Sequence, residues 1–295
     1  MKHITRRDML ATLRSYLNAK EPRIVRWLVR TWNAERDAIK YDDLEYAVLN
    51  KEVPLEWLLK WQQDYSTFVT DVLDKEWRDA IQSGGKEVQK RIREVFETGE
   101  NFSFTPTGQH IEQWITTRGG ELIVNLTQKQ LEAVRAVLRH YTVEAPVSPQ
   151  ELGRILRPII GLTPKQATAV QRFRDSLIVE GVSMQQVEKQ TLRYATQLHR
   201  FRAERIARTE LALAYNHGQY EAIRQAQEQG IIQGKVLKEW LTADDERVCE
   251  FCGPLDGQVI GFEETFVTGM KSSMTTLVPP AHPLCRCSVG YRVVE

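Results

Sequence analysis

The feature that most constrains this chain is the position of its cysteines. All four lie near the C-terminus, as the CxxC pair Cys249 and Cys252 and the CxC pair Cys285 and Cys287, with His282 just before the second pair. Four cysteines in 295 residues are too few for a disulfide scaffold. They therefore point to a local metal site or a local redox pair, and the rest of the chain has to fold by packing alone.

A structural zinc ion is the site that these residues predict best. Cys249, Cys252, His282, Cys285 and Cys287 offer five ligands of the kinds that zinc prefers, and a structural zinc ion takes four in tetrahedral geometry. If residues 285–287 are extended, both cysteines face the same side, which favours a four-cysteine site with His282 as neighbour. If they form a turn, His282 and one of those cysteines complete a Cys3His site. The spacing predicts one zinc ion per chain and leaves both ligand sets open.

Two other kinds of cysteine site fit the sequence less well. A redox CxxC normally opens a helix, and Gly253-Pro254 directly after Cys252 opposes helix formation. A hydrolytic zinc site needs an open coordination position, which three or four thiolates would fill. The sequence also lacks HExxH, GxxxxGK[ST], GxSxG and GxGxxG motifs. We therefore expect no catalytic residues.

The remainder of the chain predicts helices. Apolar residues at helical spacing follow Pro22 and Pro54, and five of the seven tryptophans lie between Trp27 and Trp77. Such aromatic residues suit either a helical core or a partner surface, and the helical spacing favours the core. The turn formers Gly84-Gly85 and Gly119-Gly120 predict interruptions and a domain boundary near residue 125.

Four capping boxes predict helix starts in the middle of the chain. Each places Ser or Thr three residues before Glu or Gln: Thr127 with Gln130, Ser148 with Glu151, Thr163 with Gln166 and Ser183 with Gln186. The last helix is expected to continue, with a break near His199, to a C-cap at Gly230, after which short strands and loops follow.

The predicted fold class is therefore mainly α, with multi-helix N-terminal and middle regions and a small α+β C-terminal module stabilised by zinc. The expected domains are a helical N-terminal domain of residues 1–125, a helical middle domain of residues 126–229 and a small β-rich zinc-binding module of residues 230–295.

Charge and hydropathy limit which kinds of partner the sequence predicts. Lys and Arg number 40 against 39 Asp and Glu, so no global basic field predicts nucleic-acid binding. The local run Arg200, Arg202, Arg205 and Arg208 keeps a zinc-ribbon nucleic-acid-binding protein as the alternative function, although a solvated helix face is the simpler interpretation. No stretch approaches the roughly 18 apolar residues of a membrane span.

Several short motifs follow one another along the C-terminal third of the chain. They are Ile206–Glu210 (IARTE), Asn216–Gly218 (NHG), Lys238–Thr242 (KEWLT) with Asp244 and Asp245, Arg247–Cys252 (RVCEFC), Leu255–Gly257 (LDG) and Pro279–Cys287 (PPAHPLCRC). Together they resemble the phage Mu F-like minor head protein family over roughly residues 200–290. Helical sections such as residues 126–199 commonly precede these motifs in that family, and the first 125 residues carry no assignable motif.

The resemblance implies a minor capsid protein of a tailed bacteriophage, located in the capsid interior of the virion and in the host cytoplasm during assembly. It implies a role in head morphogenesis and in DNA packaging or ejection. The implied partners are the portal protein, the major capsid or scaffold protein, and DNA inside the head, with no membrane and no catalysis. The family positions carried over as zinc candidates are the four cysteines and His282, whereas Arg208, Thr209 and Glu210 match its helix motif without an assignable role.

Overall fold

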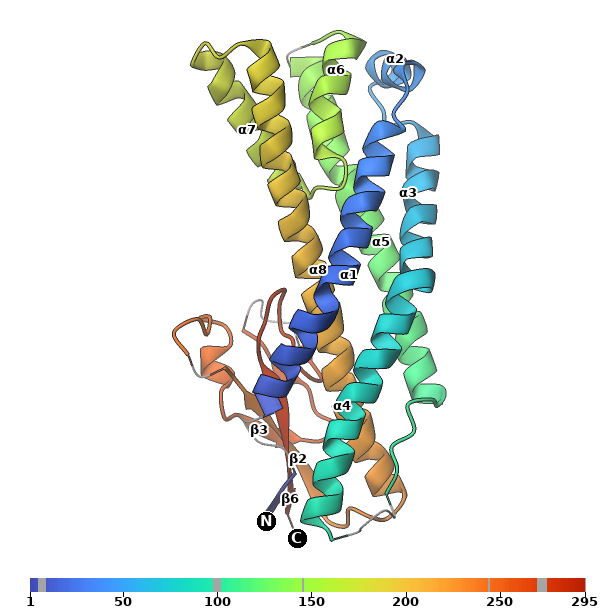
Figure 1. Ribbon diagram of the computed structural model, residues 1–295, viewed down its shortest axis with the longest axis vertical. Coiled ribbons are helices and arrows are strands. Elements are labelled where there is room, and N and C mark those ends of the chain that lie inside the picture. The colour runs from blue at the N-terminus through green and yellow to red at the C-terminus, as the bar shows by residue number, and fades with distance from the viewer. Residues whose placement is uncertain (5–8, 98–101, 145, 244, 270–274, 295) are drawn as a thin grey trace. The chain divides into compact units, whose positions relative to one another are not determined.

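The computed structural model is mainly helical, with a small sheet built chiefly from C-terminal residues (Figure 1). It describes residues 1–4, 9–97, 102–144, 146–243, 245–269 and 275–294. The α-helices are α1 (Met9–Asp37), α2 (Tyr41–Asn50), α3 (Leu55–Phe68), α4 (Asp74–Val95), α5 (Gln109–Arg139), α6 (Pro149–Leu156), α7 (Pro164–Val179) and α8 (Met184–Glu228). The strands are β1 (Lys2–His3), β2 (Lys235–Leu241), β3 (Val259–Gly261), β4 (Phe266–Val267), β5 (Thr275–Thr276) and β6 (Ser288–Val294). Short π- or 3-10-helical turns complete the described elements: η1 (Val69–Leu73), η2 (His140–Glu144), η3 (Arg157–Ile159) and η4 (Gly253–Leu255). Among the described residues, no helix is both long and apolar enough to cross a membrane.

The chain divides into two compact units, each assembled from separate segments. Unit 1 contains Met1–Pro22, Asp74–Ile115 and Arg205–Glu295, and unit 2 contains Arg23–Leu73 and Thr116–Glu204. These units do not correspond to the expected domains 1–125, 126–229 and 230–295. The expected boundary near residue 125 lies inside α5, and α1, α5 and α8 each supply residues to both units.

Unit 1 contains an antiparallel sheet with strand order β1-β6-β2-β3. Strand β6 pairs with β2 along its length, from Lys235 opposite Val294 to Leu241 opposite Ser288. The N-terminal strand β1 joins the other edge of β6, where Lys2 lies opposite Val293. A two-residue strand is too short to leave a periodic signal, so this pairing was not predictable from the sequence.

Helices α4 and α8 cross closely in unit 1 because two glycines lack side chains there. A Cβ at Gly84 would lie 2.1 Å from the carbonyl oxygen of Tyr215, and a Cβ at Gly218 would lie 2.1 Å from that of Ile81. The prediction that Gly84-Gly85 and Gly119-Gly120 interrupt helices is therefore wrong. Both pairs lie inside helices, and Gly84 serves close helix packing instead of a turn.

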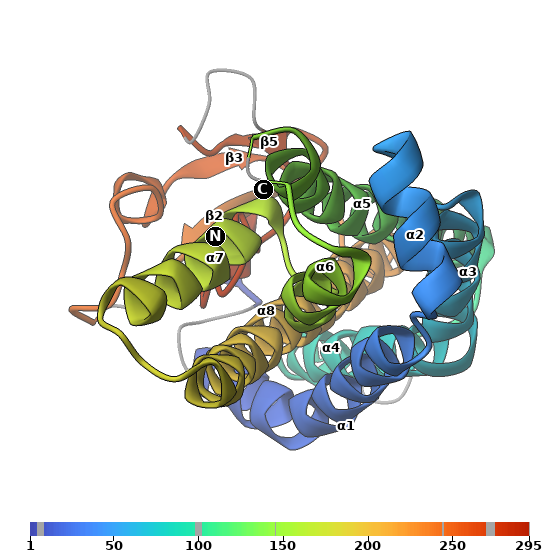
Figure 2. The same cartoon turned by 90° about the horizontal axis from the view of Figure 1, so that it is seen from above.

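The tryptophan-rich helices build a core, as their spacing indicated. Trp32, Trp57, Trp61 and Trp77 are at most 8% exposed. In unit 2, Trp32 Nε1 donates to Tyr65 Oη at 2.9 Å, and Tyr65 Oη donates to Gln130 Oε1. Helix α2 packs against α6 (Figure 2). The Leu44 side chain occupies the space beside Gly153.

The predicted helix ends have mixed outcomes. Ser148 and Thr163 each accept a hydrogen bond from the backbone N–H three residues later, which confirms them as N-caps of α6 and α7, and α8 begins directly after Ser183. Thr127 lies inside α5, where its hydroxyl donates to the carbonyl of Ile123 and is satisfied within the helix. The expected break near His199 is also absent, since α8 is continuous there.

The two prolines expected near helix starts also have different outcomes. Pro54 directly precedes α3, as predicted, whereas Pro22 lies inside α1. The burial of Ile24 and Leu28, each 0% exposed, offsets the hydrogen bond that Pro22 cannot donate within the helix. Further along the chain, Gly230 has φ +70° and follows the end of α8 as the predicted C-cap.

Candidate metal centre

The first two candidate ligands lie in a tight turn between β2 and β3. The backbone N–H groups of Cys252 and Gly253 both donate to the carbonyl of Cys249, at 3.1 and 2.9 Å. The Cys252 N–H also lies 3.4 Å from Cys249 Sγ. A single 3-10 turn, η4, follows in place of an α-helix, which agrees with the expectation that Gly253-Pro254 opposes the helix of a redox CxxC site.

The other candidate ligands come from the segment that leads into β6. The N–H of Cys285 donates to the carbonyl of His282 at 3.1 Å, so these two residues close a turn, and Leu284 within it has φ +63°. Arg286 donates to both carboxylate oxygens of Asp245, at 2.5 and 2.6 Å. This bidentate ion pair fixes the second ligand segment to the start of the first.

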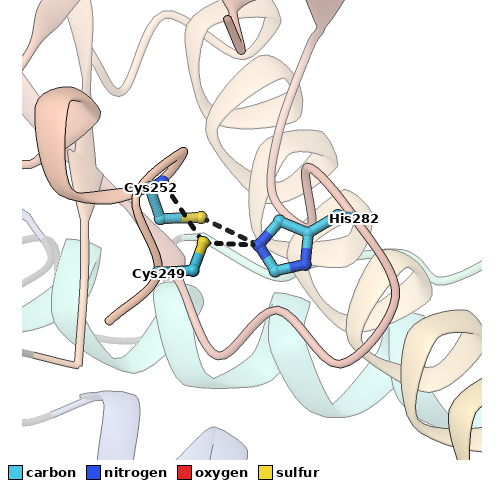
Figure 3. Close-up of side chains that lie close together, drawn as sticks. All are labelled: Cys249, Cys252 and His282. Atoms are coloured by element: carbon cyan, nitrogen blue, oxygen red, sulfur yellow. Dashed lines mark hydrogen bonds between the residues drawn. The ribbon is translucent and has the colours of Figure 1, made fainter. Parts of the chain in front are cut away.

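The side chains of the two segments meet. His282 Nε2 lies 3.1 Å from Cys249 Sγ and 3.2 Å from Cys252 Sγ (Figure 3). Cys252 Sγ lies 3.7 Å from Cys285 Sγ. Two groups of ligand atoms therefore form: Cys249, Cys252 and His282, and Cys252, Cys285 and Cys287, with all atoms of each group within 4.8 Å of one another. All five predicted residues belong to this cluster, which could hold a metal ion.

Three of the four cysteines of the cluster are buried. All four cysteines are free thiols, and Cys252, Cys285 and Cys287 are at most 4% exposed. They pack with Trp240, Leu255 and Phe266 in one hydrophobic cluster. Cysteine sulfurs held this close are suited to sharing a cation.

The peptide dipoles around Cys249 favour its thiolate form. Burial raises the pKa of this thiol, but the N–H groups of Cys252 and Phe251 oppose that effect and the net shift of its pKa is downward. A lower pKa favours metal binding because thiolates, not thiols, are the ligands.

The helix motif without an assignable role attaches the ligand segment to α8. Thr209 Oγ1 accepts a hydrogen bond from the N–H of Leu284 at 3.3 Å, and Ser288 Oγ donates to Asn216 Oδ1 at 2.8 Å. Thr209 and Asn216 are two helical turns apart on one face of α8. The segment that carries His282 and two cysteines is thus anchored to one helix face at both ends.

Other motif residues also have structural partners. Arg208 Nη1 lies 2.9 Å from Glu21 Oε2 on α1. Lys238 is fully buried in β2, and its Nζ donates to the carbonyls of Glu264 and Leu277 at 2.6 and 2.9 Å. These pairings could not be predicted from local sequence patterns, because the partners lie far away in the chain.

The arginine run that suggested phosphate binding is largely used within the protein. Arg202 is 5% exposed, donates to the carbonyl of Gly161 and lies over the Trp32 ring. Arg200 pairs with Glu204, and Arg208 pairs with Glu21. These contacts weaken the alternative of a nucleic-acid-binding face on α8.

Among the described residues, the isolated histidines and acidic residues form no second group of possible metal ligands. Burial lowers the pKa of His199 to about 4 and that of His217 to about 3, so both are neutral core residues at pH 7. Asp245 pairs with Arg286, whose guanidinium holds the pKa of that carboxyl well below its usual range. Asp244 of the same motif lies outside the described residues.

Comparison with family models finds a match, which includes the cysteine–histidine cluster. Residues 170–290 match the family described as Phage Mu protein F like protein. This part of the chain is similar to that family. The match begins within α7 and includes α8, both pairs of cysteines and most of the sheet. Searches of curated proteins and of solved structures find no match.

Proposed function

We propose that this protein is a minor capsid protein that takes part in head morphogenesis of a tailed bacteriophage. The family match over residues 170–290 carries this proposal. In it, the protein associates with the portal and the inside of the head and aids capsid assembly and DNA packaging or ejection. It is present in the host cytoplasm during assembly and in the virion afterwards. Its further contacts are with the major capsid or scaffold protein.

We also propose that the cysteine cluster holds one structural zinc ion. The donor set supports it, because thiolates and imidazole are the ligands that zinc prefers, and five of them form two groups of three that share Cys252. A small module of short strands has little core of its own and gains folding free energy from a bound metal. Three thiolates with an imidazole, or four thiolates, leave no open position for water, so the proposed role is not catalytic.

Co-expression with the portal protein of the same phage tests the function. The portal is tagged and purified after nuclease treatment and a high-salt wash, and the bound chain and its zinc are quantified. We expect the chain at a fixed ratio to the portal, at or below one copy per portal subunit, with one zinc ion per chain.

The control is the portal of an unrelated phage, which should recover none of this chain. Recovery of zinc-loaded chain with DNA, but not with its own portal, would instead favour the alternative of a zinc-ribbon nucleic-acid-binding protein. In that case binding would weaken steeply as salt rises.

A further inference from the structure

The five side chains of the cluster exceed the four that a tetrahedral zinc ion takes. Either His282 or one cysteine must therefore stand outside the coordination sphere. The geometry of the two segments distinguishes these possibilities.

His282 has the orientation of a metal ligand. Its Nε2 is almost equally distant from the two sulfurs of the CxxC turn, at 3.1 and 3.2 Å (Figure 3). Its Nδ1 lies 3.0 Å from the carbonyl oxygen of Pro283, an acceptor that requires the proton on Nδ1. The lone pair of Nε2 is then free toward the sulfurs, which is the tautomer and support that metal-binding histidines show.

Cys285 has the distance of a metal ligand. Zinc–sulfur bonds of about 2.3 Å at the tetrahedral angle place two sulfurs about 3.8 Å apart. The observed separation of Cys252 Sγ and Cys285 Sγ is 3.7 Å. The turn closed by the Cys285 N–H and the His282 carbonyl carries both residues, and the Cys252 sulfur lies near the side chain of each.

Cys287 instead continues the buried face of the sheet. It directly precedes β6, in which Val289, Tyr291 and Val293 alternate inward and are at most 3% exposed. Side chains two residues apart on a strand share a face, so Cys287 occupies the next core position of that series. Its sulfur also lies within 4.8 Å of those of Cys252 and Cys285, but the two ligand groups do not join it to Cys249 or His282. A buried cysteine that continues a core face serves as a small apolar side chain.

We infer that Cys249, Cys252, His282 and Cys285 hold the ion and that Cys287 lies outside its coordination sphere as a core residue. This inference rests on the structural metal proposed above. It names the ligands and also the one cysteine that can be exchanged without loss of the metal.

Cobalt substitution in the full-length protein tests the ligand set. Co²⁺ replaces zinc in tetrahedral sites, and the intensity of its sulfur-to-cobalt charge-transfer band grows with the number of thiolates. We expect one Co²⁺ per chain with the band of three thiolates. Cys287→Ala should leave the spectrum unchanged. Its Co²⁺ affinity should fall by much less than the about 10–100-fold loss that follows removal of a supporting residue.

Variants of the paired positions complete the experiment. Cys285→Ala should lose more affinity than that range, whereas His282→Cys should keep one Co²⁺ and shift the spectrum to that of four thiolates. The His282→Cys result remains decisive even if Cys285→Ala fails to fold, which circular dichroism would reveal.

Opposite outcomes separate the two levels of the proposal. A four-thiolate spectrum in the unchanged protein, lost in Cys287→Ala and kept in His282→Ala, would overturn the ligand set and leave the structural metal standing. Failure of the reduced protein to bind either Co²⁺ or Zn²⁺ would remove the metal site, and the ligand set with it.

Discussion

Glu35 is a carboxyl group buried in the core of unit 2. It is 5% exposed, its Oε2 accepts a hydrogen bond from Gln130 at 2.9 Å, and its Oε1 has no hydrogen-bond partner among the described residues. Burial raises its pKa to about 8, while the Gln130 hydrogen bond and the charges of Lys60 and Arg202 lower it and Asp64 raises it. The side chain is therefore mostly protonated at neutral pH.

This pKa predicts how stability depends on pH. Between the unfolded value near 4.5 and the folded value near 8, the unfolded chain releases a proton that the folded chain keeps, so Glu35 makes folding less favourable as pH rises through this range. Glu35→Gln removes that dependence. We expect the variant to gain roughly 2–3 kcal/mol over the native protein between pH 5 and pH 7.5, measured by urea unfolding.

The matched control is Glu52→Gln, which changes an exposed carboxylate in the same unit. Its stability relative to the native protein should change little over the same pH range. Equal pH profiles for Glu35→Gln and the native protein would show that Glu35 is ionised in the folded state.

At the scale of elements, the crossing of α4 and α8 depends on small residues. Gly218→Ala would push a methyl group against the Ile81 carbonyl, so we expect a loss of at least about 1–3 kcal/mol in unfolding free energy. Gly120→Ala is the control, because a Cβ there meets nothing within 4 Å in the helix α5. It should instead stabilise the protein by about 0.5–1 kcal/mol. Equal effects of the two substitutions would contradict the close crossing.

Helix α8 also supports the segment that carries His282, Cys285 and Cys287. Ser288→Ala would remove the hydrogen bond to Asn216, which anchors one end of the ligand segment. Because supporting residues hold ligands in place, we expect zinc affinity to fall by about tenfold in competition with a chelator. Ser176→Ala, at an exposed position on α7, should leave the affinity unchanged. A zinc affinity of Ser288→Ala equal to that of Ser176→Ala would show that the anchor does not act on the metal.

Whole-molecule organisation shows where sequence reasoning succeeds and where it stops. The helical class, the N-caps Ser148 and Thr163 and all five members of the cysteine–histidine cluster were predictable, because they depend on local spacing. The two interleaved units were not, because they depend on contacts between distant segments. The same reason hid the role of Thr209, whose partner lies 75 residues further along the chain.

The division of the chain into two interleaved units also predicts which elements lose protection when the proposed zinc ion is removed. The ligand segment contacts α8 through Thr209 and Asn216, and Arg208 continues this connection to Glu21 on α1, all within unit 1. Removal of zinc with a chelator should therefore speed amide hydrogen exchange in β6, in the CxxC turn and in residues 206–219 of α8. Helices α2 and α6 belong entirely to unit 2 and should keep their protection.

Hydrogen exchange with mass spectrometry measures this directly on the full-length protein. Zinc added back should restore slow exchange, and Cys287→Ala should respond to the chelator and to zinc as the native protein does. Faster exchange confined to residues 235–294 would mean that the metal stabilises only the sheet module, and equal acceleration in α2 and α6 would mean that the two units unfold as one. Acceleration that reaches α8 but not α2 or α6 is the result expected if the metal stabilises unit 1 through the anchored ligand segment.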